Sequence, residues 1–380
     1  MPYRVEGAFK VSGPASLRIV EGTVNLLGAT LGEGSTITVP VGRTYLASTP
    51  SALIDVAPSP DRVVKASLGE YEEYEDVARQ VKDSRNPVIV GPTDAGKSTL
   101  AAWALNLASS SGDARLMTTD VGQNEVYCPG FIALAKPLNG VALPGAAFNV
   151  EASCFVGSFT PARAEARYLL CSSRLSRRPG WTIVDTDGWV TPWEGLELKA
   201  ALASSIGSSL IVAMGLPPEH VRYLKDTSGV EVLAIQARAG HGKSREERRR
   251  HRERLLAKHL VGGRSRPVKV GDTPVYGAPV FVGTPLQDPG PGAVYGEERM
   301  DGVVRVVRGE ARGRGVLKLG WEKGLLAGLV RGDMAYPGVV ERIIYQRRVV
   351  VVYTRYDGPV DYLIVGTARI DLAPYTGKAA

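Results

Sequence analysis

The feature that most constrains this chain is the stretch VIVGPTDAGKSTL, residues 88–100. Gly91 is followed by four residues and then by Gly96, Lys97 and Ser98, which is the spacing G-x-x-x-x-G-K-[ST]. Three apolar residues precede the motif and a helical pattern follows it, so we expect a strand, a loop and a helix in that order. Such a loop turns backbone N–H groups inward around a phosphate, and the following helix points its positive end at the same place.

The residues of this phosphate loop have separate expected tasks. Lys97 should reach the β- and γ-phosphates of a nucleotide, and Ser98 should ligate Mg²⁺. The Asn-Lys-x-Asp motif of Ras-type GTPases does not occur after the loop, which favours ATP or a loose nucleotide specificity. A chance glycine turn is the alternative interpretation, and the flanking patterns argue against it. The expected nucleotide-binding residues are Gly91, Pro92, Thr93, Asp94, Ala95, Gly96, Lys97, Ser98 and Thr99.

The apolar pattern divides the 380 residues into three expected domains. Residues 1–68 hold short β-prone runs separated by Gly- and Ser-rich turns, which predicts an N-terminal β domain. Residues 69–262 begin with a linking helix over 69–84 and then alternate apolar strands with helical patterns, which predicts a central α/β domain with a parallel sheet. Residues 263–380 are rich in Val, Ile and Tyr with Gly between the runs, which predicts a small, mostly-β C-terminal domain.

Acidic residues follow two predicted strands of the central domain, where ligands of such sheets bind. Asp120 ends the predicted strand of residues 115–120, and Gln123 lies on the loop beyond it. Asp120 is therefore a candidate metal ligand or proton acceptor, the alternative being that it only caps a turn. Asp185 and Asp187 end the segment WTIVDTD and suit contact with a metal or a substrate.

Two further features favour a nucleic-acid partner. Trp189 follows Asp185 and Asp187 and could stack on a base, with core burial as an equal alternative. Residues 243–254 carry seven Lys or Arg against three Glu, within a chain of net charge +7. Most such runs are solvated helix faces. Here Arg248 and Arg252 could close over phosphates, because a guanidinium binds phosphate oxygens in pairs.

Composition narrows the class of protein. No apolar run approaches the roughly 18 residues of a membrane span, and the N-terminus lacks the apolar segment of a signal peptide. We therefore expect no membrane partner and a cytoplasmic protein, or a nuclear one in a eukaryote. Cys128, Cys154 and Cys171 are odd in number and widely spaced, which predicts small buried side chains and no disulfide framework. The four histidines are too scattered for a metal cluster.

Together, these motifs resemble one family, the polynucleotide 5′-hydroxyl kinases, which includes the kinase subunit of the eukaryotic pre-mRNA cleavage complex and the ribosomal-RNA-processing kinases. The resemblance rests on GPTDAGKST, DVGQNEVYCPG, SFTPARAEARY, DTDGWV and KSREERRRHR, and it extends into the C-terminal part through GLVRGDMAYPGVVERI and VGTARI. It covers the central domain well and the end domains loosely. The few cysteines and the compact, arginine-rich sequence would also suit an archaeal member.

The resemblance implies ATP, Mg²⁺ and transfer of the γ-phosphate to the 5′-OH of RNA or DNA, with RNA-processing proteins as further partners. It implies that Asp120 is the base for the 5′-hydroxyl and that Trp189 stacks on bases. It also implies that Arg248 and Arg252 belong to a mobile lid over the transferring phosphate. The expected catalytic residues are thus Lys97, Asp120, Arg248 and Arg252. The expected substrate contacts are Gln123, Trp189 and, in a clasp near the terminal nucleotide, Thr160 and Pro161; the expected metal ligands are Ser98 and Asp120.

Three functions compete on the sequence alone. A 5′-hydroxyl kinase leads, because Asp120 and the lid arginines are present. The second is a scaffold subunit of an RNA-processing complex that binds ATP without turnover. The third is a generic phosphate-loop ATPase, which leaves Trp189 and the basic run unexplained. The chain departs from the family pattern at Thr118, where some relatives have a second acid, and at TPWEG, which replaces a glycine-rich continuation after DTDGWV.

Overall fold

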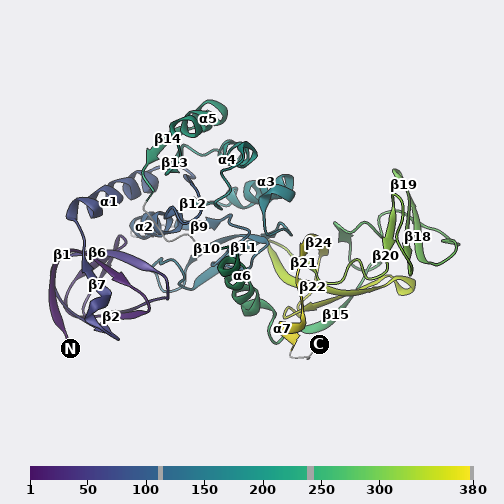
Figure 1. Ribbon diagram of the computed structural model, residues 1–380, viewed down its shortest axis with the longest axis horizontal. Helices are drawn as coiled ribbons and strands as arrows, with labels where there is room; N and C mark the ends of the chain where they lie inside the picture. The colour runs from purple at the N-terminus through teal and green to yellow at the C-terminus, as the bar shows by residue number, and fades with distance from the viewer. Residues whose placement is uncertain (110–113, 238–243, 377–380) are drawn as a thin grey trace. The chain divides into compact units, whose positions relative to one another are not determined.

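The computed structural model describes residues 1–109, 114–237 and 244–376, and Figure 1 shows their helices and strands. The chain forms two compact units, each assembled from several chain segments. The first consists of Met1–Thr119, Leu134–Val150 and Ser172–Gly242, and the second of Asp120–Ala133, Glu151–Cys171 and Lys243–Ala380. The sequence-based boundaries after residues 68 and 262 divide the chain differently and stay predictions.

The N-terminal part of the first unit is an antiparallel β-sheet, as the short β-prone runs predict. Strand β6 (Thr44–Ala57) pairs with β1 (Tyr3–Ser12), β2 (Ala15–Gly22) and β3 (Val24–Leu26). Its alternating burial follows from the period of two along a half-buried strand. The sheet is completed by β4 (Ala29–Leu31), β5 (Thr36–Val39) and β7 (Val63–Lys65), and the short 3₁₀ turn η1 (Pro60–Arg62) precedes β7.

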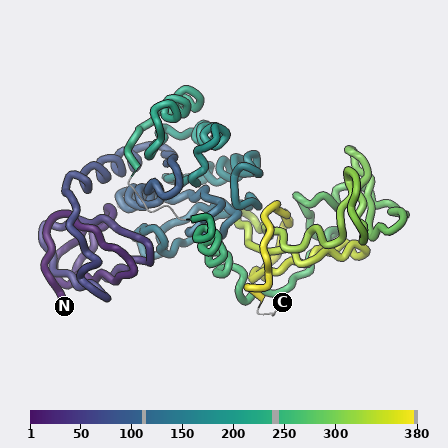
Figure 2. Tube along the Cα trace, in the orientation of Figure 1, coloured from purple at the N-terminus to yellow at the C-terminus, as the bar shows by residue number. Residues whose placement is uncertain are grey.

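A linking helix joins this sheet to the α/β part, and Figure 2 lets the reader follow the chain through it. Helix α1 (Leu68–Asp83) confirms the helical pattern predicted for residues 69–84. The rings of Tyr71 and Tyr74 pack on Trp103, with centroids 5.0 and 6.0 Å apart. Trp103 belongs to α2 (Lys97–Ser109), the helix that follows the phosphate loop. Aromatic packing therefore ties the linking helix to the helix that carries the loop.

The central sheet has the parallel core that the alternating pattern predicts. Its strand order is β11-β10-β9-β12-β8-β13-β14, and the strands from β9 to β14 in that order run parallel. Strand β8 (Val88–Val90) is buried throughout because α2 packs on it and both faces of such a sheet are covered. The others are β9 (Ala114–Thr118), β12 (Trp181–Asp185), β13 (Leu210–Met214) and β14 (Glu231–Ile235), with β10 (Phe131–Pro137) and β11 (Phe148–Phe155), which have residues in both units.

Four more helices accompany the sheet segments. Helices α4 (Trp193–Ser205) and α5 (Pro218–Ser228) pack against each other in the first unit (Figure 1). Helix α3 (Glu165–Ser176) follows the 3₁₀ turn η2 (Pro161–Arg163). Helix α6 (Arg245–Leu260) lies in the second unit. Among the described residues, no helix is long and apolar enough to cross a membrane.

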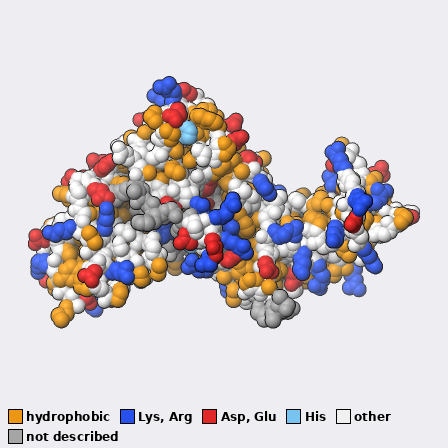
Figure 3. Space-filling view, viewed as in Figure 1, with side chains coloured by type: hydrophobic (Ala, Val, Ile, Leu, Met, Phe, Trp, Pro, Cys, Tyr) orange, Lys and Arg blue, Asp and Glu red, His pale blue; other side chains and the backbone are white. Residues whose placement is uncertain are grey.

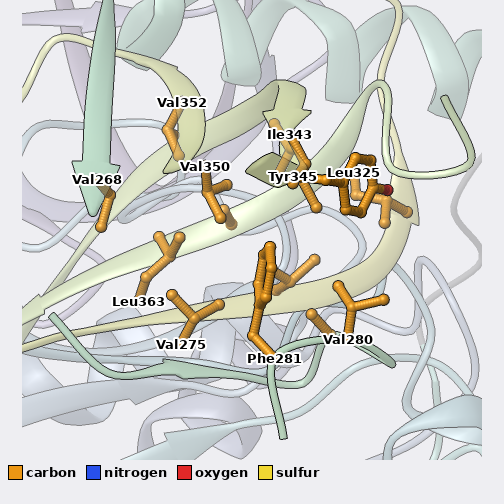
Figure 4. Packing of buried hydrophobic residues seen from close by; sticks show 14 of the residues in the cluster. Val268, Val275, Val280, Phe281, Leu325, Ile343, Tyr345, Val350, Val352 and Leu363 are labelled. Carbon is orange, nitrogen blue, oxygen red and sulfur yellow. The ribbon is translucent and has the colours of Figure 1, made fainter. Parts of the chain in front are cut away.

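The C-terminal part of the second unit is mostly β, as its Val-, Ile- and Tyr-rich runs predict. Figure 4 shows Val268, Val350, Val352 and Leu363 packed in one apolar cluster with Phe281. One sheet has six strands: β15 (Arg264–Lys269), β16 (Val275–Tyr276), β21 (Leu325–Arg331), β22 (Met334–Ile344), β23 (Val349–Thr354) and β24 (Tyr362–Arg369). The other has four: β17 (Thr284–Pro285), β18 (Ala293–Arg299), β19 (Gly302–Val307) and β20 (Val316–Lys318). The turn η3 (Tyr345–Arg347) and the helix α7 (Ala373–Thr376) complete this part.

A second apolar cluster of this unit joins segments that are far apart in sequence. Phe131 and Phe155 meet edge to face, with centroids 5.0 Å apart. They share a buried cluster with Leu326, Val339 and Tyr353 of the six-stranded sheet. The residues around the predicted base and clasp therefore have their core in common with the C-terminal sheet.

The structure contradicts the expectation that the cysteines form no disulfide. Cys154 of β11 and Cys171 of α3 are bonded to each other, with Cα atoms 5.4 Å apart and a separation of 17 positions in the sequence. The sequence could not show this because the two residues meet only when α3 packs back on β11. Cys128 is a free, buried thiol, and burial raises its pKa well above the usual value.

Candidate functional site

The phosphate loop of the first unit connects β8 to α2, the context that the motif requires. Lys97 is the first residue of α2, and its side chain is only 7% exposed. Its Nζ donates to the carbonyls of Gly91 and Pro92, at 3.0 and 2.8 Å. The ammonium group thus lies across the loop, with the positive end of α2 beginning at the same residue.

The two motif glycines are required by the shape of this loop. A Cβ atom at Gly91 would lie 2.5 Å from the carbonyl oxygen of Met214, at the end of β13. Gly96 has φ +95°, in the left-handed region that side chains rarely adopt. Asp94 also has a positive φ of 62°. The turn is therefore tight: a close backbone contact excludes a side chain at Gly91, and the backbone conformation disfavours one at Gly96.

A hydroxyl and a carboxylate meet beside the loop. Ser98 Oγ donates to Asp185 Oδ2 at 2.7 Å. Asp185 is the last residue of β12, which pairs with both β8 and β9, so the topology alone brings it to the carboxyl edge next to the loop. Hydroxyl and carboxylate oxygens are the hard ligands that Mg²⁺ takes, so this pair fits a magnesium site.

The sequence predicted Ser98 and Asp120 as metal ligands. In the structure, the side chain of Ser98 donates a hydrogen bond to Asp185. Asp120 belongs to the second unit. Asp185 was recognisable as an acid at the end of a strand, but its pairing with Ser98 depends on the order of strands in the sheet. Among the described residues, no group of three or more His, Cys, Asp or Glu side chains could hold a metal ion by itself.

The segment after Asp185 is a tight turn against the phosphate loop. Thr186 Oγ1 donates to the carbonyl of Ile89 at 2.7 Å, which fixes the start of the turn on β8. The side chain of Asp187 accepts from the backbone N–H of Trp189 at 2.8 Å and from Lys199 Nζ at 2.5 Å. Trp189 itself is partly exposed, so it is neither fully buried in the core nor free on the surface. Sequence reasoning did not single out Lys199.

In the second unit, Asp120 forms the turn cap that was the alternative to a chemical role. Its Oδ1 accepts from the backbone N–H groups of Gly122 and Gln123, each at 2.9 Å. Capping uses one carboxylate oxygen and sets the orientation of the other. The cap thus defines the loop on which Gln123 lies.

The predicted lid residue Arg252 lies over Phe159, the residue that precedes the predicted clasp pair of Thr160 and Pro161. Its guanidinium carbon is 4.9 Å from the centre of the Phe159 ring. Burial lowers the pKa of Arg252, while the negative charges of Glu253 and Asp120 act to raise it. Within the second unit, the Asp120 carboxylate, the clasp and Arg252 are thus near one another.

The clasp itself is ordered by local hydrogen bonds. Ser158 Oγ donates to the carbonyl of Thr160 at 2.7 Å and accepts from its N–H at 3.3 Å. Thr160 is the cap of η2, and Pro161 is the first residue of that turn and is buried. Proline suits this position because its fixed φ matches the turn and its missing N–H would have no partner there.

Helix α6 carries the basic run, and Figure 3 shows Lys and Arg gathered with Asp and Glu over it. Ser244 and Glu247 form a capping box at its start. Arg249 pairs with Glu253 at 2.9 Å and Arg250 with Glu246 at 2.5 Å, each one turn away. These pairs offset the repulsion among the arginines. Arg248 is half-buried on the same helix, and Lys243, the first cation of the basic run, lies outside the described residues.

The central part of the chain matches a known family. Residues 91–261 match the model described as the phosphate loop of the mRNA cleavage and polyadenylation factor CLP1. The chain is 26% identical over 195 residues to the Protein CLP1 homolog of Arabidopsis thaliana, covering 46% of this chain and 43% of that one. It is 31% identical over 175 residues to the Polynucleotide 5′-hydroxyl-kinase GRC3 of Gibberella zeae, covering 40% and 22%.

Another relative and a solved structure extend the comparison. The Polyribonucleotide 5′-hydroxyl-kinase Clp1 of Rattus norvegicus is 26% identical over 252 residues, 59% of each chain. The chain thus spans roughly half or less of most of these relatives. A solved structure titled as the wild-type Clp1p–Pcf11p complex is similar with a TM-score of 0.62 and 12% identity, covering 97% of this chain and 98% of that one.

The solved structure shows the fold alone, and it agrees with a central phosphate-loop domain flanked by β-rich parts. The family model covers the loop, the turn after β12 and helix α6, which are the segments described above. The kinase names of two relatives agree with the motifs on which the sequence resemblance rests. The match of residues 91–261 and the names of these relatives support the polynucleotide 5′-hydroxyl kinase family of the Clp1 and GRC3 proteins as the family that the phosphate-loop part of the chain resembles.

Proposed function

We propose that the chain is an ATP-dependent polynucleotide 5′-hydroxyl kinase that transfers the γ-phosphate to the 5′-OH end of RNA, DNA or both. The observation that carries the proposal is the arrangement of Lys97 and of the Ser98–Asp185 pair around one phosphate loop. A loop that merely turned the chain would need neither the ammonium group across it nor a carboxylate on its serine.

The chain's own groups divide the work of phosphoryl transfer. Lys97 and the backbone N–H groups of the loop bind the phosphates and offset their charge. Ser98 and Asp185 would hold Mg²⁺, which supplies further neutralisation of the β- and γ-oxygens. We assign Asp120 the acceptance of the proton from the 5′-hydroxyl.

The second unit supplies the groups that we assign to the nucleic-acid end. Arg252, and Arg248 one turn before it, would stabilise the charge that develops on the transferring phosphoryl group, because the guanidinium fork binds its oxygens in pairs. Gln123, Thr160 and Pro161 would position the terminal nucleotide, and Trp189 of the first unit would stack on a base. The cytoplasmic or nuclear location is part of the same proposal.

A scaffold role is the second candidate, and one observation favours it. Two similar solved structures are titled as complexes or interfaces of Clp1p with Pcf11p, so a protein of this fold binds a protein partner. A chain with that role would bind ATP and keep it. Protein partners from RNA processing are compatible with either function.

The test uses γ-labelled ATP with RNA and DNA oligonucleotides of one sequence, each in a 5′-OH and a 5′-phosphate form. The proposal expects label on the 5′-OH oligonucleotides and none on the matched 5′-phosphate forms. Label on neither form, with ATP recovered unchanged from the protein, would favour the scaffold. Release of labelled phosphate that does not depend on an oligonucleotide would favour a generic ATPase.

A further inference from the structure

Lys199 lies at a position where burying a lysine costs free energy of folding. It is in the middle of α4, its side chain is fully buried, and the other buried positions of that helix are Gly, Leu and Ala. A charged side chain in such surroundings requires a partner, because its lost hydration is otherwise uncompensated. Lys199 Nζ donates to Asp187 Oδ2 at 2.5 Å, and Asp187 is itself only 5% exposed.

Asp187 connects this buried cation to the backbone of Trp189. Its Oδ2 binds Lys199, while its Oδ1 accepts from the N–H of Trp189 at 2.8 Å. The first turn of α4 lies against the same residue, since a Cβ at Gly195 would be 2.5 Å from the carbonyl oxygen of Trp189. The Trp189 backbone is therefore held on both sides by α4, on one side through the ion pair and on the other by direct contact.

The phosphate loop beside this turn has supports of its own. Gly188 lies against the loop, because a Cβ there would be 2.4 Å from Thr93 Oγ1 and 2.6 Å from Thr93 N. The bond from Thr186 to Ile89 and the bond from Ser98 to Asp185 do not involve Lys199. Loss of the ion pair should therefore loosen Trp189 more than it loosens the loop.

We propose that Lys199 is a positioning residue for nucleic-acid binding: through Asp187 it fixes the backbone of Trp189 and so aims the indole at the base on which it stacks. The inference rests on the proposed function, in which Trp189 is the stacking residue. Holding the ring in place before binding matters because a loose ring must be ordered at the moment of binding, which weakens affinity. Lys199 acts on the oligonucleotide through Trp189 and touches no phosphate in this scheme.

The test variant removes both charges together. Lys199→Met alone would leave the Asp187 carboxylate buried without its cation, so folding itself would suffer. The pair Lys199→Met with Asp187→Asn removes both buried charges of the ion pair and keeps an oxygen to accept from the Trp189 N–H. Exposed Lys225 of α5 gives the matched control, as Lys225→Met makes the same change of side chain on the surface.

The readouts are steady-state transfer and quenching of a 2-aminopurine oligonucleotide. For the pair variant, we expect the oligonucleotide KM and Kd to rise about tenfold, in the lower range for one stacked base. The kcat and the KM for ATP should stay within about twofold, and Lys225→Met should change nothing. In a Trp189→Ala background the pair should cause no further loss of oligonucleotide affinity, because the residue it positions is absent.

Two results of the oligonucleotide measurements overturn the inference. One is unchanged oligonucleotide affinity in the pair variant; the other is an equal loss in the Trp189→Ala background, which would mark Lys199 as a general structural residue. The emission attributable to Trp189, taken as the difference from each protein's Trp189→Phe counterpart, gives a readout without nucleic acid. Absence of transfer by the wild type would overturn the proposed function, whereas an unshifted Trp189 emission would overturn the positioning of Trp189.

Discussion

At the residue scale, each group assigned to the site has a different kind of support. Lys97 is held over the phosphate loop by two backbone carbonyls, and Ser98 is held by Asp185. Asp120 is oriented by the turn that it caps. Arg252 rests on an aromatic ring. Substitutions at these positions should therefore impair different steps of binding and transfer, and kinetic measurements on the variants can separate the roles.

Replacement of the loop lysine tests the assignment of the loop as the active site. We expect Lys97→Ala to abolish transfer, because the ammonium group offsets charge on the β- and γ-phosphates, which is a large part of phosphoryl-transfer catalysis. The measurement is the initial rate of label transfer at saturating oligonucleotide. A rate within about tenfold of the wild type would contradict the assignment.

Asp120→Asn separates a base from a metal ligand. Asparagine keeps an Oδ1 that can accept from Gly122 and Gln123, so the turn should persist while the proton acceptor is lost. We expect the transfer rate to fall by about 10² or more with ATP affinity largely intact. Equal losses of ATP affinity and transfer would instead indicate a metal ligand. Asp120→Ala, which also removes the cap, is the control for disorder of the loop.

The lid arginines should act on the rate of transfer far more than on ATP affinity. Arginines that reach the transferring phosphate contribute about 10³–10⁵ in rate in other phosphoryl-transfer enzymes. We expect large losses for Arg248→Ala and Arg252→Ala, and poor rescue by lysine, which lacks the guanidinium fork. Single-turnover transfer with both substrates saturating is the measurement. Wild-type rates in both alanine variants would mean that α6 is a solvated helix.

At the element scale, the disulfide joins β11 to α3 and encloses the clasp. Residues 155–170 lie between Cys154 and Cys171, including Phe159, Thr160 and Pro161. Closing a loop of this length stabilises the folded state by about 3 kcal/mol, mostly by restricting the unfolded chain. The same segment supplies the ring on which Arg252 rests, so the covalent link holds a part of the proposed site.

Reduction should therefore lower the stability of the second unit. We expect a reductant to lower the melting temperature of the wild type by several degrees, as a loss of about 3 kcal/mol implies. The Cys154→Ser, Cys171→Ser double variant should start at the lower value and should not respond to the reductant. A wild type that melts identically with and without reductant would mean that the bond contributes nothing. Cys128 serves as an internal control, because its buried, unbonded thiol is present in both the wild type and the double variant.

Local patterns predicted the elements well and the contacts between them poorly. The linking helix, the parallel strands and the phosphate loop follow from spacing within one short segment, and the structure confirms the fold that they imply. The Ser98–Asp185 pair, the disulfide and the Lys199–Asp187 pair each join residues on different elements. Residue type did offer one hint that was missed: a lysine in the middle of an apolar helix requires a buried partner.

At the scale of the whole molecule, the second unit has a core that no continuous stretch of the chain can build. Cys128, Phe131 and Phe155 precede the basic helix, while Leu326 and Val339 come from the C-terminal sheet, yet all five share one buried cluster. A Cβ at Gly130 would lie 2.3 Å from the side chain of Leu326, so the two segments fit closely. A boundary after residue 262, as the sequence suggests, would separate residues that pack together.

A chain that stops after residue 262 should therefore fail to fold around its clasp. Removing the C-terminal sheet exposes Phe131 and Phe155, which are fully or almost fully buried in the intact protein. We expect such a truncated chain to bind a hydrophobic dye and to aggregate, while the full chain does neither. Co-expression of residues 263–380 as a separate chain is the control, and it should restore solubility. A soluble, dye-silent truncation would support the three-domain division.

Because the two units are interleaved along the chain, segments of one unit are synthesised between segments of the other. The chain passes from one unit to the other after residues 119, 133, 150, 171 and 242, and the residues of the C-terminal sheet that share a cluster with Phe131 are made long after it. At roughly 5–20 residues per second, about 200 residues between Phe131 and Leu326 take roughly 10–40 seconds to emerge. During that interval, the nascent chain carries the clasp and the base without the sheet that covers their core. We therefore expect a chaperone to bind the nascent chain on the ribosome during this interval.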